Sequence, residues 1–164
     1  MHTTALPPPD AARLAVLFHH LLAAMDGLID AERDMIGLPG HDPAVDAWFT
    51  AAERARDTVL GLIATGLDAP SAAPDDVSLR HVLRLFRRVM LSDDPADVEQ
   101  LRLQASAMTE QCLAHGVCGA DCALNRLVLQ GLDRFEAYLM LEESGADLPA
   151  PDTIAQVEEL APAA

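Results

Sequence analysis

The chain has 164 residues, of which 51% are hydrophobic and only 4% aromatic. Its eleven basic residues, all arginine, stand against 26 carboxylates, which gives a formal charge of −15. A charge of this sign repels phosphate backbones and anionic lipids, so the composition argues against general nucleic-acid or membrane binding. The length is that of one domain, and a core built from Leu, Ala, Val and Met favours closely packed helices.

An apolar stretch at residues 14–25 has some features of a signal peptide. Against a signal peptide, Asp10 and three prolines precede the stretch, His19 and His20 interrupt it, and Asp26 ends it. We predict that the stretch is too short to span a bilayer. Three cysteines are an odd number, which fits poorly with a fully paired secreted disulfide framework. We therefore predict a cytoplasmic protein without a membrane segment.

The first predicted helix follows a Pro-rich leader, residues 1–9, which is expected to be flexible. Asp10 is suited to cap a helix that continues to about Ile36, because its carboxylate can accept a free backbone N–H. Apolar residues then recur every three or four positions, so one side of this helix is expected to face a core.

A second helix is predicted from the Asp42–Pro43 pair to about Gly66. An aspartate followed by proline is a strong start signal, since proline fits the first helical turn. Trp48 and Phe49 fall on the apolar side of this helix, so we predict that both are core residues.

Residues 67–76 form a Pro-, Ala- and Asp-rich connection to a third helix, predicted at 77–91. Neither half of the chain has enough apolar faces for a core of its own, so this connection is not expected to be a domain boundary. Asp94 and Pro95 repeat the start signal and open a fourth helix, predicted to extend to about His115.

A helix break is predicted at Gly116 and Gly119, because glycine readily adopts the left-handed conformation that closes helices. A fifth helix is predicted at 122–143, ended by Gly145.

These elements predict an all-α protein, a single-domain antiparallel helical bundle of about five helices over residues 10–145. The Pro- and Ala-rich tail, 146–164, is expected to be irregular, with at most one short helix. The apolar content is high for a bundle of this size, so an apolar face is expected to remain for a partner. We expect a homo-oligomer, in the simplest case a dimer, or binding to another protein.

One cluster of soft ligands stands out, formed by Cys112, His115, Cys118 and Cys122 in the order C-x2-H-x2-C-x3-C. The spacing resembles the cluster-binding run of bacterial ferredoxins, C-x2-C-x2-C-x3-C, with histidine in the second position and Ala123 in place of the proline that follows the last cysteine. This resemblance covers eleven residues and implies an iron–sulfur cluster.

Three other interpretations of the cluster remain open. Three thiolates and an imidazole can form a tetrahedral zinc site, which the helical flanks favour over an iron–sulfur cluster. Thiols at helix ends can also act as redox switches. Alternatively, the cysteines are ordinary buried residues with no cofactor. On one unbroken helix the four positions extend over about 15 Å, too far for a single ion, so a metal site requires the helix to break.

A basic stripe on the third predicted helix holds four of the eleven arginines: Arg80, Arg84, Arg87 and Arg88. Guanidinium groups pair with phosphate and carboxylate, so the stripe is a candidate site for an anion or an acidic partner. The alternative is that these arginines pair with acidic faces of the same molecule.

No Glu-x-x-His pair, H-E-x-x-H motif, phosphate-binding glycine loop or G-x-S-x-G turn is present in the sequence. Catalysis therefore has no sequence support. We predict a non-catalytic helical interaction protein with no cofactor. The alternative is a metal-binding or redox-responsive module built on the cysteine cluster.

Overall fold

The computed structural model describes residues 9–36, 45–70, 76–114 and 121–146. These ranges contain five helices and no strand: α1 (Pro9–Met35), α2 (Val45–Asp68), α3 (Asp76–Leu91), α4 (Pro95–Ala114) and α5 (Asp121–Ala146). The predicted all-α bundle of five helices is confirmed. The leader 1–8 and the tail 147–164 lie outside the described ranges.

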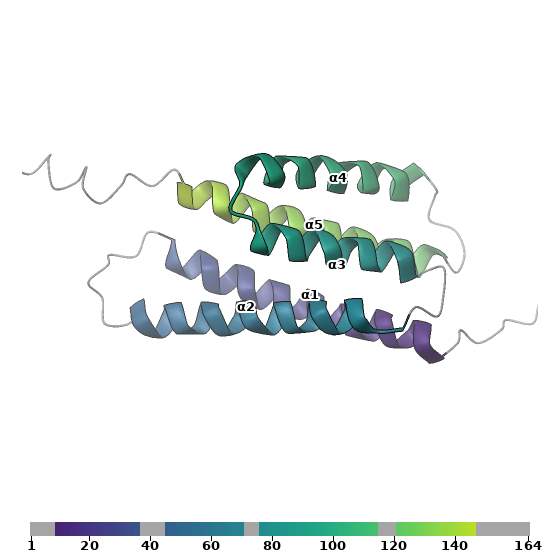
Figure 1. Cartoon of the computed structure of the whole chain (residues 1–164), viewed down its shortest axis with the longest axis horizontal. Helices are drawn as coiled ribbons and strands as arrows, with labels where there is room; N and C mark the ends of the chain where they lie inside the picture. Colours follow the sequence, from purple (N-terminus) through teal and green to yellow (C-terminus); the bar gives the residue numbers. More distant parts are fainter. Residues whose placement is uncertain (1–8, 37–44, 71–75, 115–120, 147–164) are drawn as a thin grey trace, which may run out of the picture.

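The helices lie with their long axes roughly side by side (Figure 1). In Figure 1 each helix starts at the end of the bundle where the preceding one stops, so helices adjacent in the chain run in opposite directions. α1 and α2 pack together on one side of the molecule, and α5 packs against α1, α3 and α4. Among the described helices, α4 contacts only α3 and α5. One long side of α4 is therefore left without a neighbouring helix.

A single cluster of buried side chains draws on all five helices. Phe86 of α3 and Phe135 of α5 meet edge to face in this cluster, with ring centroids 5.7 Å apart and planes inclined at 71°. This geometry is favoured because the electropositive edge of one ring meets the electronegative face of the other. Burial of apolar surface throughout this cluster is the main force that holds the five helices together.

The fourth helix begins as its sequence predicts. The Asp94 carboxylate accepts a hydrogen bond from the backbone N–H of Ala96, with Oδ1 and N 2.9 Å apart, so Asp94 caps the start of α4. Elsewhere the bounds differ slightly from the predictions: α1 includes Pro9, and α5 continues past Gly145 to Ala146. The Asp42–Pro43 start signal lies outside the described residues.

The prediction that Trp48 and Phe49 are core residues is wrong. Their exposed fractions are 38% and 55%, whereas Ala52, one turn further along α2, is buried. Figure 1 shows that α2 begins beyond the nearby ends of α3 and α4, so its first turns have fewer neighbours. Helical spacing predicted the side on which Trp48 lies but not where the bundle ends.

The apolar part of α1 is longer than the stretch at residues 14–25 that the sequence indicated. By length and composition alone, the 23 residues Arg13–Met35 are enough to cross a membrane, which differs from the prediction that the apolar stretch is too short. The core helix of a soluble protein and an N-terminal signal sequence have the same properties. In this structure Phe18, Met25 and Leu28 are fully buried against other helices, as a core helix requires.

Candidate functional site

The cysteine cluster falls at the junction of α4 and α5. α4 ends at Ala114 and α5 begins at Asp121, so the two are separate helices. Cys112 lies in the last turn of α4 and Cys122 in the first turn of α5. The other two candidate ligands, His115 and Cys118, and the glycines between them lie outside the described residues. The four-ligand site therefore stays a prediction.

The two described cysteines are both free thiols and both partly buried. Cys112 packs against the core of the bundle, and this burial raises the pKa of its thiol because a thiolate is poorly solvated there. Among the described side chains, no group of three or more His, Cys, Asp or Glu residues is placed to hold a metal ion. A metal site at this junction would need ligands from outside the described ranges.

The arginine stripe divides into one structural residue and three surface residues. Arg80 is only 8% exposed. Its Nη1 donates a hydrogen bond to the carbonyl of Leu67 at 2.8 Å, and its Nη2 donates to the carbonyl of Ala69 at 2.5 Å. Both carbonyls belong to the end of α2, where backbone acceptors have no helical partner. Arg80 therefore ties α3 to α2 rather than facing a ligand.

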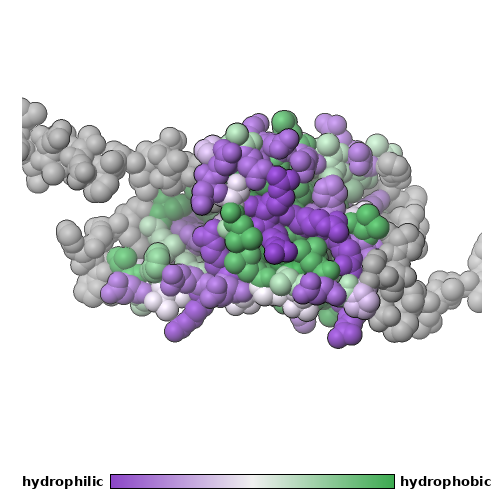
Figure 2. All heavy atoms as spheres, viewed as in Figure 1, coloured by the Kyte–Doolittle hydropathy of each residue, from purple (hydrophilic) through white to green (hydrophobic). Residues whose placement is uncertain are grey.

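The other three arginines, Arg84, Arg87 and Arg88, are exposed and line one surface depression. This depression, called the arginine groove below, has a volume of about 680 Å³, and its walls also include Leu67, Leu91, Ser92 and Asp97. It lies over α3, where Figure 2 shows hydrophilic and hydrophobic surface side by side.

Charge pairing in the arginine groove is incomplete. Arg88 forms an ion pair with Asp97 at the start of α4. Within the described part of the chain, Arg84 and Arg87 have no hydrogen bond or ion pair, although the whole chain carries a net charge of −15. Two exposed guanidinium groups of the groove thus have no anionic partner among the described residues. Leu91, 61% exposed, supplies an apolar contact beside them.

α4 has apolar residues outside its core-facing stripe as well as within it. The stripe carries Leu101 and Ala105 into the core. Away from that stripe, Leu103 and Leu113 are 63% and 60% exposed, as is Ala107 between them in the chain, and the two leucines lie about 80° apart around the helix axis. We call this second surface, Leu103, Ala107, Leu113 and Ala114, the outer face of α4. This face was not predicted from the sequence, although leucines outside the core stripe of a helix are a detectable signal.

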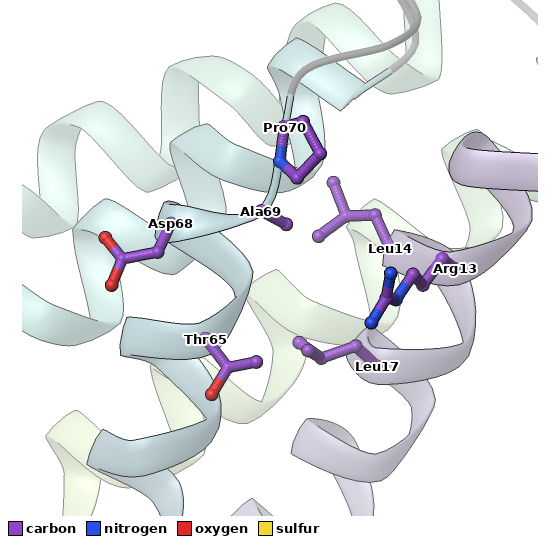
Figure 3. Close-up of a pocket in the computed structure, with 7 residues that line it drawn as sticks. All are labelled: Arg13, Leu14, Leu17, Thr65, Asp68, Ala69 and Pro70. Atoms are coloured by element: carbon purple, nitrogen blue, oxygen red, sulfur yellow. The ribbon is translucent and has the colours of Figure 1, made fainter.

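A further cavity, of about 390 Å³, lies between the start of α1 and the end of α2. Figure 3 shows that Leu14, Leu17 and Pro70 surround it, and that the Asp68 carboxylate points away from it. Among the described residues that line it, the ionisable groups Arg13 and Asp68 therefore do not converge on a common point.

Comparison of the chain with protein-family models, with curated proteins and with solved structures finds no match. Function is therefore inferred from the side chains and surfaces of this molecule alone.

Proposed function

We propose that the protein is a non-catalytic interaction protein that forms a homodimer through the outer face of α4. The observation that carries this proposal is the set of exposed apolar side chains on α4, a helix that among the described elements contacts only α3 and α5. Exposed leucines on a long helix lose contact with water when a second molecule covers them, and each fully buried leucine contributes about 2 kcal/mol.

The outer face of α4 carries little charge, which suits a second copy of this chain as the partner. Two molecules with a net charge of −15 each repel one another over most of their surfaces. Between residues 103 and 114 of α4, however, Glu110 is the only charged residue. Glu110 lies on the same face as Ala107, three residues away, so each copy brings one carboxylate to the contact, far less charge than the molecule carries as a whole.

The outer face also suits a twofold contact. A homodimer interface places the same surface of both molecules in contact, with each residue meeting its counterpart across the axis. If two α4 helices cross in opposite directions, Leu103 of one copy lies near Leu113 of the other. The axis then falls near Ala107, whose small side chain allows a close approach of the two helices.

The test is the oligomeric state of the full chain and of the variant Leu103→Glu, measured by sedimentation equilibrium over a dilution series. We expect the unsubstituted protein to be a dimer. A buried glutamate at this position should cost about 2 kcal/mol or more, a roughly thirty-fold weakening of the dimer. Circular dichroism of the variant checks that the helices still form.

Two variants serve as controls for the added charge. Val16→Glu changes a residue of α1 that is 54% exposed, and Phe49→Glu changes one of α2 that is 55% exposed. Both should leave the dimer unchanged. A monomeric unsubstituted protein, or a dimer lost only in Phe49→Glu, would contradict the proposed interface.

The proposal includes a cytoplasmic location and no bound cofactor. It is supported by the acidic surface and by the odd number of cysteines, which does not suit a fully paired secreted framework.

A second function, a metal-binding or redox-responsive module, is favoured by one observation. α4 and α5 are separate helices, so the condition that the helix ends between Cys112 and Cys122 is met. Zinc bound by Cys112, His115, Cys118 and Cys122 is the form that we propose, with an iron–sulfur cluster as the alternative.

Metal analysis and an absorption spectrum of protein purified without oxygen test this second function. A zinc site should give about one zinc per chain, and an iron–sulfur cluster should give a visible absorption band. The triple variant Cys112→Ser, Cys118→Ser, Cys122→Ser should lose both. Metal-free protein with an unchanged thiol count after mild oxidation would reject the module.

A further inference from the structure

The arginine groove has the chemistry of a docking site for an acidic segment. Arg84 and Arg87, which have no partner among the described residues, lie seven and four residues before Leu91 on the same helix. Residues three or four apart on a helix lie on one face. A segment that fits this groove must therefore combine carboxylates with apolar side chains.

One part of this chain has that combination. Residues 147–164 contain four carboxylates and no basic residue. The carboxylates are Asp147, Asp152, Glu158 and Glu159. The apolar residues Ile154, Val157 and Leu160 recur every three positions among them. In a molecule with a net charge of −15, such a segment is attracted to a cluster of arginines and repelled by the many carboxylates elsewhere.

We propose that residues 152–160 dock in the arginine groove of the same molecule. Glu158 and Glu159 pair with Arg84 and Arg87, while the apolar residues of the segment cover Leu91 and Leu67. Carboxylate–guanidinium pairs can form two parallel hydrogen bonds, which adds orientation to the attraction. This inference does not depend on the proposed dimer, because the groove lies over α3 and the outer face lies on α4.

The length of chain is sufficient for this contact. α5 ends at Ala146, at the same end of the bundle as the last turn of α3 (Figure 1). The eleven residues 147–157 can extend to about 36 Å. α3, with 16 residues, is about 24 Å long. Arg84 lies seven residues, about 10 Å of helix, before the end of α3, so about 25 Å of the extended segment is available for the separation between the ends of α5 and α3.

The experiment is nitrogen-15 relaxation on the full chain, with the heteronuclear NOE of residues 152–160 as the readout. In the unsubstituted protein these values should approach those of the helices, because docked residues move with the bundle. The double variant Arg84→Glu, Arg87→Glu should lower them to the values of a free chain. Adding Glu158→Arg and Glu159→Arg to that variant reverses the charge of the segment as well as that of the groove, and should restore the high NOE values.

A matched control separates pairing from overall charge. Arg54 and Arg126 are also exposed, and within the described residues neither has an ion pair. The variant Arg54→Glu, Arg126→Glu therefore adds the same negative charge elsewhere and should leave the NOE values of the segment unchanged.

Four results would overturn the proposal. They are free-chain NOE values in the unsubstituted protein, unchanged values in the Arg84→Glu, Arg87→Glu variant, failure of the charge-reversed pair to restore them, and values that fall on dilution. The last result would assign the contact to a second copy of the chain. Concentration-independent values with loss and restoration as described would establish docking within one molecule.

Discussion

Arg56 of α2 donates a hydrogen bond from Nη2 to the hydroxyl of Tyr138 in α5, at 3.2 Å, across 82 residues of sequence. The same nitrogen donates to the backbone carbonyl of Met90 at 3.1 Å, near the end of α3. One guanidinium group therefore joins three helices at the edge of the core. Tyr138 is only 3% exposed, so its hydroxyl depends on protein partners rather than on bulk water.

We expect Arg56→Met to lower the free energy of unfolding by about 1 to 2 kcal/mol, because two acceptors lose a charged donor while much of the side-chain volume remains. Tyr138→Phe should cost about 1 kcal/mol. Urea denaturation of both single variants and the double variant gives the coupling between the residues. A coupling energy near zero would mean that this hydrogen bond adds nothing to stability.

Gly131 marks a close approach of α5 to the core. A Cβ atom added there would lie 2.8 Å from Cζ of Phe18 and 3.0 Å from Cγ1 of Val82. These neighbours are a ring and a β-branched side chain, which have little room to move. We expect Gly131→Ala to destabilise the protein by about 1 kcal/mol or more, because overpacking exceeds the gain in helix propensity. The measurement is thermal unfolding.

Gly27 of α1 provides the matched control. A Cβ at this position would have no neighbour within 4 Å. Gly27→Ala should therefore stabilise the protein by about 0.5 to 1 kcal/mol, as expected for alanine in place of glycine within a helix. Equal stabilisation by both substitutions would show that Phe18 and Val82 move aside to accommodate a Cβ atom at residue 131.

Local signals in the sequence predicted the helices well, since they depend on residues close together in the chain. Asp94 is an N-cap as expected, and apolar spacing identified buried residues such as Phe18 and Leu28. The exposure of Trp48 and Phe49 could not be predicted, because spacing defines the side of a helix but not where neighbouring helices stop.

The spacing of residues within one helix did not predict the contacts between helices. Arg80 and Arg84 lie on one helix and have the same side chain, yet one is buried against α2 and the other is exposed. The difference arises because the end of α2 presents two carbonyl groups to Arg80. The sequence of α3 alone does not show which of its arginines meets the end of α2. The cysteine cluster was recognised from sequence, and its arrangement depends on His115 and Cys118, outside the described residues.

Arg80 should therefore matter for stability and not for binding. Arg80→Met removes the donors to the carbonyls of Leu67 and Ala69, and we expect a loss of about 2 kcal/mol in the free energy of unfolding. Arg54→Met, on the exposed side of α2, should change it by less than about 0.5 kcal/mol. Urea denaturation compares the two. Similar values for both variants would contradict the role of Arg80 at the end of α2.

The thiol of Cys112 gives a prediction that depends on pH. Burial raises its pKa, so in the folded protein it stays neutral to a higher pH than in the unfolded chain. Folding stability from this group is fully present below the unfolded pKa and is lost as pH rises through the raised folded pKa. In the variant Cys118→Ser, Cys122→Ser, which leaves Cys112 as the only thiol, alkylation by iodoacetamide should therefore have its midpoint at a higher pH than in denaturant.

The alkylation rate of Cys112 also separates the interpretations of the cysteine cluster. The thiolate is the reactive form, so desolvation of Cys112 slows alkylation at neutral pH. A metal ion favours the thiolate, but it binds the sulfur lone pair that would attack iodoacetamide, so Cys112 is alkylated only after the ion is removed. The same titration on protein with all three cysteines, before and after treatment with a chelator, therefore distinguishes them. Cys112 of a metal-free protein should react at the same rate in both samples, whereas a bound ion should protect Cys112 until the chelator removes it.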